Sequence, residues 1–129
     1  MHRVEFDRVD LVDDELAIVV LHRGAALTPL RVCVGPRAAA LVSIAATWRR
    51  SSRPLTHDLL QEVMHSFGLE LEWVVIAEGE EDLFLAELVV SGRGEWAPFD
   101  SRPADAIAFA LREGAPIFVT DDAAKRSSK

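Results

Sequence analysis

Two stretches organise this chain: Arg53-Pro-Leu-Thr-His-Asp-Leu-Leu60 and, later, Asp100-Ser-Arg-Pro-Ala-Asp-Ala-Ile107. Each contains an Arg-Pro pair, followed by the start of a predicted helix with an acidic residue in its first turn. Proline is favoured at the first helical position because its missing N–H needs no partner there, and a carboxylate in the first turn meets the positive end of the helix dipole. The pattern therefore predicts two similar helix starts, and it has a structural explanation before any functional one.

Hydrophobic periodicity divides the rest of the chain into strands and helices. Alternating apolar runs predict strands over residues 4–12, 16–22, 29–34, 71–77, 83–91, 95–99 and 116–120. Patterns with helical spacing predict helices over 36–50, 57–67 and 102–113. These elements predict a single α+β domain with a mixed, mostly antiparallel sheet and about three helices. Both faces of the run 83–91 are largely apolar, so we expect both to be covered.

Helical spacing also predicts the core. The expected core residues are Leu41, Ile44, Ala45 and Trp48 in the first helix, Leu59, Leu60, Val63, Met64 and Phe67 in the second, and Ala104, Ile107, Ala110 and Leu111 in the third. Asp105, Phe109 and Arg112 lie on the other side of the third helix. Because an outward Phe109 is out of place in a monomer, we expect it to meet a partner subunit or to line a groove.

Length and charge limit the class of protein. The 129 residues, half of them hydrophobic, predict one domain over residues 1–122, followed by a flexible basic tail over 123–129. The 14 Lys and Arg against 21 Asp and Glu give a net charge of −7. The chain therefore lacks the basic surface typical of nucleic-acid binding, although an acidic protein can process nucleic acid when carboxylates hold a divalent cation.

Cysteine content and hydropathy bear on the cellular location. A single cysteine, Cys33, excludes an internal disulfide and a Cys-rich zinc site, and its alternating apolar surroundings predict a buried side chain. The N-terminus does not resemble a signal peptide, and no apolar run has the length of a membrane span. We therefore expect a cytoplasmic protein with no membrane partner.

The residues with chemical potential gather at the two helix starts. Metal-assisted phosphodiester cleavage needs carboxylates to hold Mg²⁺ or Mn²⁺, a group to transfer a proton and a cation to meet the phosphate. The candidate catalytic residues are His57, Asp58, Asp100 and Asp105, and the three aspartates are also the candidate metal ligands. The candidate phosphate-binding residues are Arg53, Arg102 and Thr56.

Each candidate also has a structural interpretation. Asp58 and Asp105 could do no more than complement helix dipoles, and Asp100 could be a turn or capping residue. His57 could cap a helix or be partly buried, and either arginine could pair with an acid instead of a phosphate. There is no phosphate-binding glycine loop, no HExxH and no paired CxxC, so spacing alone predicts no reaction.

The two stretches, together with Phe84-Leu-Ala86 and Gly114-Ala-Pro-Ile-Phe-Val119, resemble the bifunctional nuclease domain family of bacteria and plants. The resemblance covers nearly the whole chain in order. It implies a compact α+β fold and a nuclease that acts on both DNA and RNA. The polar residues shared by the family fall on the seven candidate residues named above.

The sequence departs from the family pattern at two positions. Ala38 stands where the family commonly has Glu early in the first helix, and Ala104 stands where the second motif usually has Ser. These losses and the acidic charge favour an alternative, a non-catalytic oligomeric scaffold or regulatory interaction module. In either case we expect a homo-oligomer, with a dimer as the first expectation.

Overall fold

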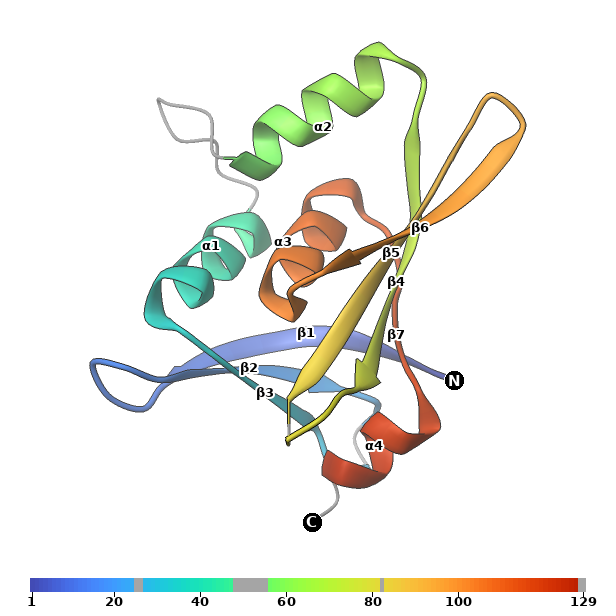
Figure 1. Cartoon of the computed structure of the whole chain (residues 1–129). Coiled ribbons are helices and arrows are strands. Elements are labelled where there is room, and N and C mark those ends of the chain that lie inside the picture. Colours follow the sequence, from blue (N-terminus) through green and yellow to red (C-terminus); the bar gives the residue numbers. More distant parts are fainter. Residues whose placement is uncertain (25–26, 48–55, 82, 128–129) are drawn as a thin grey trace.

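The computed structural model describes residues 1–24, 27–47, 56–81 and 83–127 (Figure 1). The strands are β1 (His2–Leu11), β2 (Ala17–His22), β3 (Leu30–Val34), β4 (Glu70–Glu78), β5 (Phe84–Gly92), β6 (Glu95–Ser101) and β7 (Ile117–Val119). The helices are α1 (Pro36–Ala46), α2 (Thr56–Ser66), α3 (Pro103–Glu113) and α4 (Asp121–Ser127). The expected α+β domain with a mixed sheet is confirmed, with α4 as an additional helix.

All seven strands form one sheet in the order β3-β2-β1-β7-β4-β5-β6. Each neighbouring pair is antiparallel except β4 and β7, which run parallel. The short strand β7 lies between β1 and β4 and so joins two antiparallel groups, β1–β3 and β4–β6. The three strands predicted at 71–77, 83–91 and 95–99 form the second of these groups.

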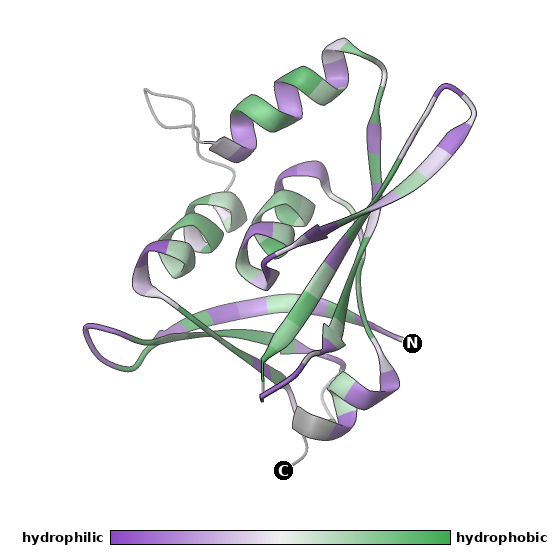
Figure 2. Ribbon diagram, viewed as in Figure 1, coloured by the Kyte–Doolittle hydropathy of each residue, from purple (hydrophilic) through white to green (hydrophobic). Residues whose placement is uncertain are grey.

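Helix α3 is the centre of the helical layer. It packs against α1, α2, β4 and β5, and Figure 1 shows it between α1 and the strands. Pro103 occupies its first turn, and Gly114 ends it in the left-handed conformation at φ 66°, a backbone geometry that glycine adopts without strain. Figure 2 shows hydrophobic residues along α1, α3 and the strands beside them.

The expected core residues Ala104, Ile107 and Ala110 of α3 are buried, whereas the expected core faces of α1 and α2 are largely wrong. Phe109 is buried rather than outward, because α2 packs across that side of α3. Helix α2 makes this contact through His57 and Met64, while its apolar residues Leu59, Leu60, Val63 and Phe67 are exposed. In α1 the buried residues are Ala39, Val42 and Ala45, and Trp48 lies outside the described residues.

Two expectations at other positions also differ from the structure. Cys33 is exposed, because β3 is an edge strand whose alternate residues, Leu30 and Val32, point into the core. The expected flexible tail from residue 123 is largely helix α4, in which Ala123 and Ala124 are buried. Burial of small apolar side chains fixes this segment in spite of its polar neighbours.

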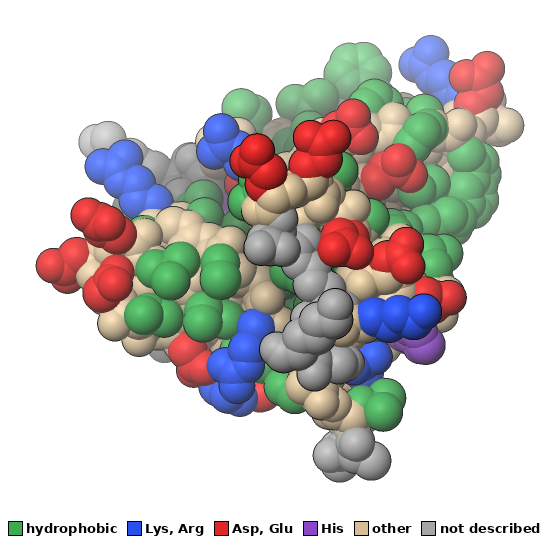
Figure 3. All heavy atoms as spheres, turned by 60° about the horizontal axis from the view of Figure 1, so that its bottom comes forward, with side chains coloured by type: hydrophobic (Ala, Val, Ile, Leu, Met, Phe, Trp, Pro, Cys, Tyr) green, Lys and Arg blue, Asp and Glu red, His purple; other side chains and the backbone are tan. Residues whose placement is uncertain are grey.

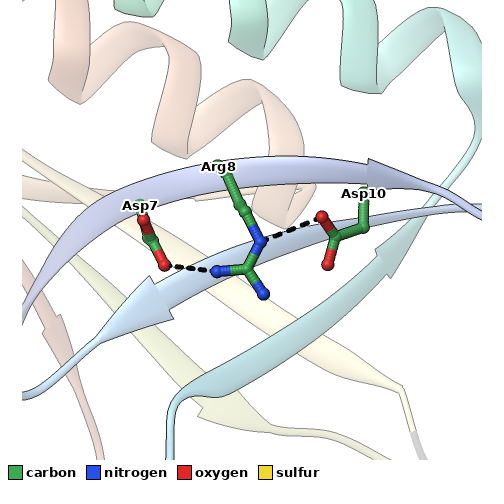
Figure 4. Close-up of polar contacts among 3 residues, drawn as sticks. All are labelled: Asp7, Arg8 and Asp10. Atoms are coloured by element: carbon green, nitrogen blue, oxygen red, sulfur yellow. Dashed lines mark hydrogen bonds and ion pairs between the residues drawn. The ribbon is translucent and has the colours of Figure 1, made fainter.

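A bulge in β1 accompanies an exposed ion cluster. The register with β2 shifts between Phe6 and Arg8. Next to the shift, the Arg8 guanidinium lies 2.6 Å from an Asp7 carboxylate oxygen and 3.0 Å from one of Asp10 (Figure 4). Asp10, by its hydrogen bond and its charge, raises the pKa of Arg8 further above its usual range. Because the cluster is exposed, water screens it, and we assign it little stabilising effect.

The register of β4–β6 defines two faces. We call the face toward the helices the inner face; it carries Val74, Ile76, Ala86, Leu88 and Ser101. The opposite, outer face carries Trp73, Val75, Ala77, Leu85, Glu87, Val89, Ser91, Trp96, Pro98 and Asp100. Leu85, Glu87, Trp96, Pro98 and Asp100 are exposed. The inner face is covered as expected, and within the described chain the outer face is open.

Candidate functional site

A cavity of about 410 Å³ lies between the helices and the strands β5 and β6. It is lined by Leu41, Thr56, His57, Leu60, Leu88, Ser101, Asp105 and Phe109. Thr56 and His57 come from the start of α2, whereas Ser101 and Asp105 come from the junction of β6 and α3. The fold therefore brings parts of both sequence stretches to one cavity with a largely apolar wall.

His57 is the most buried of the candidate site residues. The Arg112 Nε–H donates a hydrogen bond of 3.4 Å to His57 Nε2, and Asp58 Oδ1 lies 3.7 Å from the same nitrogen. Burial lowers the pKa of His57, and nearby Arg112 lowers it further, against the opposing effect of Asp58 and Asp105. His57 is thus held neutral, and this hydrogen bond assigns its ring proton to Nδ1.

Asp58 and Arg112 form an ion pair between α2 and α3. Arg112 Nε lies 3.4 Å from Asp58 Oδ1, and both side chains are almost completely shielded from water. A second link between α2 and α3 joins His65 Nε2 to Glu113 Oε2 at 3.1 Å. Asp58 therefore does more than complement its own helix dipole, since it connects the two helices.

Asp105 and Thr56 are exposed residues that line the cavity. Thr56 is already part of α2, so the position that caps this helix lies outside the described residues. Arg102 caps α3 through its backbone, because its carbonyl accepts the Ala106 N–H at 3.0 Å. The Arg102 side chain is exposed and is not part of the cavity wall.

Asp100 does not share this cavity. In the register of β5 and β6, Ser101 pairs with buried Ala86, whereas Asp100 pairs with Glu87 on the outer face. Successive side chains of a strand point to opposite faces, so the sheet separates Asp100 from His57 and Asp105. The remaining candidate, Arg53, lies outside the described residues.

The described residues do not assemble the expected metal ligands. No group of three or more His, Cys, Asp or Glu side chains within the described part of the chain could hold a metal ion. Of the three aspartates, one faces Arg112, one lies on the outer face and one lines the cavity. Divalent cations need several oxygen ligands that converge on one point, so this arrangement does not fit the group.

Sequence reasoning missed Arg112 and Ser101. The spacing of Asp105, Phe109 and Arg112 places them along one side of α3; the first two line the cavity and the third contacts His57. That shared side was a usable signal, but it was interpreted as facing outward. Ser101 gave no signal of its own, since its importance depends on which face of β6 is covered.

The fold is a single α+β domain with a largely apolar cavity to which two helix starts contribute a few polar side chains. The chain belongs to the bifunctional nuclease domain family, whose sequence profile matches residues 19–129. The match extends through α4, beyond the boundary expected at residue 122.

Two uncharacterised proteins, from two strains of Mycobacterium tuberculosis, are similar to this chain. Each is 33% identical over 92 residues, which cover 71% of this chain and 54% of the relative. The chain thus spans about half the length of the curated relatives it matches. Separately, within the described residues no helix is long and apolar enough to cross a membrane.

Proposed function

We propose that this domain is a nuclease that hydrolyses phosphodiester bonds of DNA and RNA. The observation that carries the proposal is the cavity to which both family stretches contribute polar side chains. Asp105 adds a carboxylate that can accept a proton, and His57 lines the same wall. The cavity is small enough to take one nucleotide of a strand at a time.

In the proposed reaction a water oxygen attacks the phosphorus and its proton passes to the Asp105 carboxylate. The bond from phosphorus to the leaving sugar oxygen breaks, that oxygen takes a proton from a second water molecule, and Asp105 afterwards releases its proton to solvent. Thr56 supplies a hydroxyl donor at the cavity wall, whereas the Ser101 hydroxyl donates to the Arg102 carbonyl and offers an acceptor oxygen. Proton transfer by His57 stays a prediction from the sequence, because the Arg112 N–H occupies its acceptor nitrogen. Arg112 acts only through His57, which it orients.

A divalent metal and the roles of Asp58, Asp100, Arg53 and Arg102 stay predictions from the sequence and the family resemblance. Because the described residues do not converge as metal ligands, the hydrolysis proposed above includes no metal ion. A cytoplasmic location also stays a prediction, which fractionation of cells would test.

The direct test is cleavage of labelled single-stranded RNA and DNA by the purified chain, with Mg²⁺ or Mn²⁺ and with a chelator. We expect Asp105→Asn to reduce the rate by about a hundredfold or more, the usual effect of losing an acid–base group. Asp100→Asn is the matched control, since it makes the same change in an aspartate on the outer face. Loss of activity in Asp100→Asn with full activity in Asp105→Asn would overturn the assignment to this cavity.

A second candidate function is a homo-oligomeric interaction module. It is favoured by the exposed apolar side of α2, made of Leu59, Leu60, Val63 and Phe67. A second copy could cover this side and, because α2 also lines the cavity, lie next to the site. The mass in solution tests the idea: we expect a dimer that Phe67→Asp converts to a monomer, and a monomeric unmodified chain would contradict it.

A further inference from the structure

The outer face of β4–β6 is an apolar surface without a cover in the described chain. Trp96 is 58% exposed, and Pro98, opposite Val89, is exposed beside it on β6. Leu85, also 58% exposed, lies further along β5, beyond the pair Glu87 and Asp100. Figure 3 shows hydrophobic side chains gathered at the right of the view, where these strands lie, with acidic side chains next to them. Exposed apolar surface rimmed by polar residues often marks an interaction site.

Two tryptophans and a carboxylate form a corner on this face. The rings of Trp73 and Trp96 have centroids 5.2 Å apart and planes tilted by 54°. A bulge in β4 lies at Glu72, whose Oε1 accepts a hydrogen bond of 2.5 Å from Ser91 Oγ. Ser91 pairs with Trp96 across the strands, so the carboxylate is held beside the two rings.

The charge of the surface indicates what it can bind. Every charged residue of β4, β5 and β6 is acidic. Glu87 and Asp100 are exposed and lie directly opposite each other on the outer face, an arrangement of like charges that is unfavourable without a cation. A nucleic acid would be repelled here, and so would a second copy placed with the same face against it.

We infer that the outer face docks a basic polypeptide segment of another protein, with an arginine side chain stacked on the exposed ring of Trp96 and directed toward Glu72. A guanidinium stacks on aromatic rings and pairs with a carboxylate in the same plane, so this corner supplies both of its preferred contacts. Apolar residues of the segment would cover Leu85 and Pro98. The inference does not depend on nuclease activity.

The test uses the full chain and synthetic peptides in which leucine alternates with arginine, with citrulline or with glutamate. Citrulline keeps the shape of arginine and removes its charge. We expect the arginine peptide to bind and to shift the indole N–H signals of Trp73 and Trp96 in NMR spectra. Trp96→Ala should weaken binding about tenfold or more, as for a central interface aromatic, and Glu72→Gln should also weaken it.

Leu59→Ala is the matched control, because Leu59 is as exposed as Trp96 but lies on α2. Its affinity for the arginine peptide should equal that of the unmodified chain. Equal binding of the citrulline peptide, or unchanged binding by Trp96→Ala, would overturn the inference. The inference would also be wrong if the unmodified chain is a dimer and Trp96→Ala is a monomer. In that case a second copy of the chain occupies the outer face.

Discussion

Helices α2 and α3 start from nearly the same sequence pattern but have different environments. Each has eleven residues and an aspartate in its first turn. Helix α3 is buried on almost every side, whereas α2 is attached through one side and exposes four large apolar residues. The comparison teaches that a helix-start pattern determines where a helix begins but not how deeply it is buried.

The two aspartates differ in the same way. Asp58 is shielded and faces Arg112, whereas Asp105 is exposed at the cavity wall. The first therefore joins two helices, and the second is available for chemistry. We expect four measurable consequences of the different burial of residues in α2 and α3, ordered from the largest effect to the smallest.

Phe109→Ala in α3 should lower the free energy of unfolding by about 3–5 kcal/mol, because it leaves a void in the core. Phe67→Ala in α2 should change it by less than about 0.5 kcal/mol, since Phe67 is 63% exposed whereas Phe109 is 2% exposed. Urea unfolding monitored by circular dichroism measures both values. Equal losses would show that α2 is covered in solution.

Arg112→Ala should lower the free energy of unfolding by about 3 kcal/mol, because Asp58 then keeps its buried position without this cation. Arg102→Ala, at the exposed start of the same helix, is the control and should stay within about 0.5 kcal/mol. If the two variants lose the same stability, the contact between α2 and α3 does not depend on this ion pair.

The stability of the protein should also depend on pH through His57. Its pKa is lowered in the folded state, so between that value and the ordinary pKa of about 6.5 the unfolded chain binds more protons. Stability should therefore fall as the pH drops below about 6.5, and His57→Gln should flatten this part of the curve. Thermal melts of both chains across this range measure the difference, and parallel curves would contradict the burial of a neutral His57.

Asp105→Asn should have the smallest effect on folding, within about 0.5 kcal/mol, because the side chain is exposed. Under the proposed function it should nevertheless reduce cleavage. A melt and an activity assay on the same preparation separate the two effects. A large loss of stability would mean that Asp105 is structural, as its helix-dipole interpretation suggests.

Most of the fold could be predicted because strand and helix signals are local. Pro36, Pro103 and Gly114 mark helix ends that lie close to where the sequence places them. The orientation of α2 could not be predicted from the sequence. One side of the helix carries apolar residues and the other carries polar residues that can bond to α3, so the position of α3 decides which side is buried. Helix α4 was missed because its buried part consists of two alanines, which carry little hydrophobic signal.

The site was only partly predictable, for a geometric reason. Thr56, His57 and Asp105, three of the candidates taken from the sequence, line one cavity. Asp100 and Ser101 are neighbours in the sequence, and strand alternation sends them to opposite faces. No local pattern reveals which of the two faces the helices, so the sequence favoured the aspartate and overlooked the serine.

The short strand β7 has a consequence for how the protein is made. Within the described chain, residues 117–119 provide the pairing that connects the N-terminal hairpin region to the β4–β6 group. They follow all the other strands of this sheet in the chain, so the two strand groups join only after residues 117–119 have left the ribosome. A nascent chain that stops short of residue 117 therefore keeps two groups of strands that are not hydrogen-bonded to each other through β7.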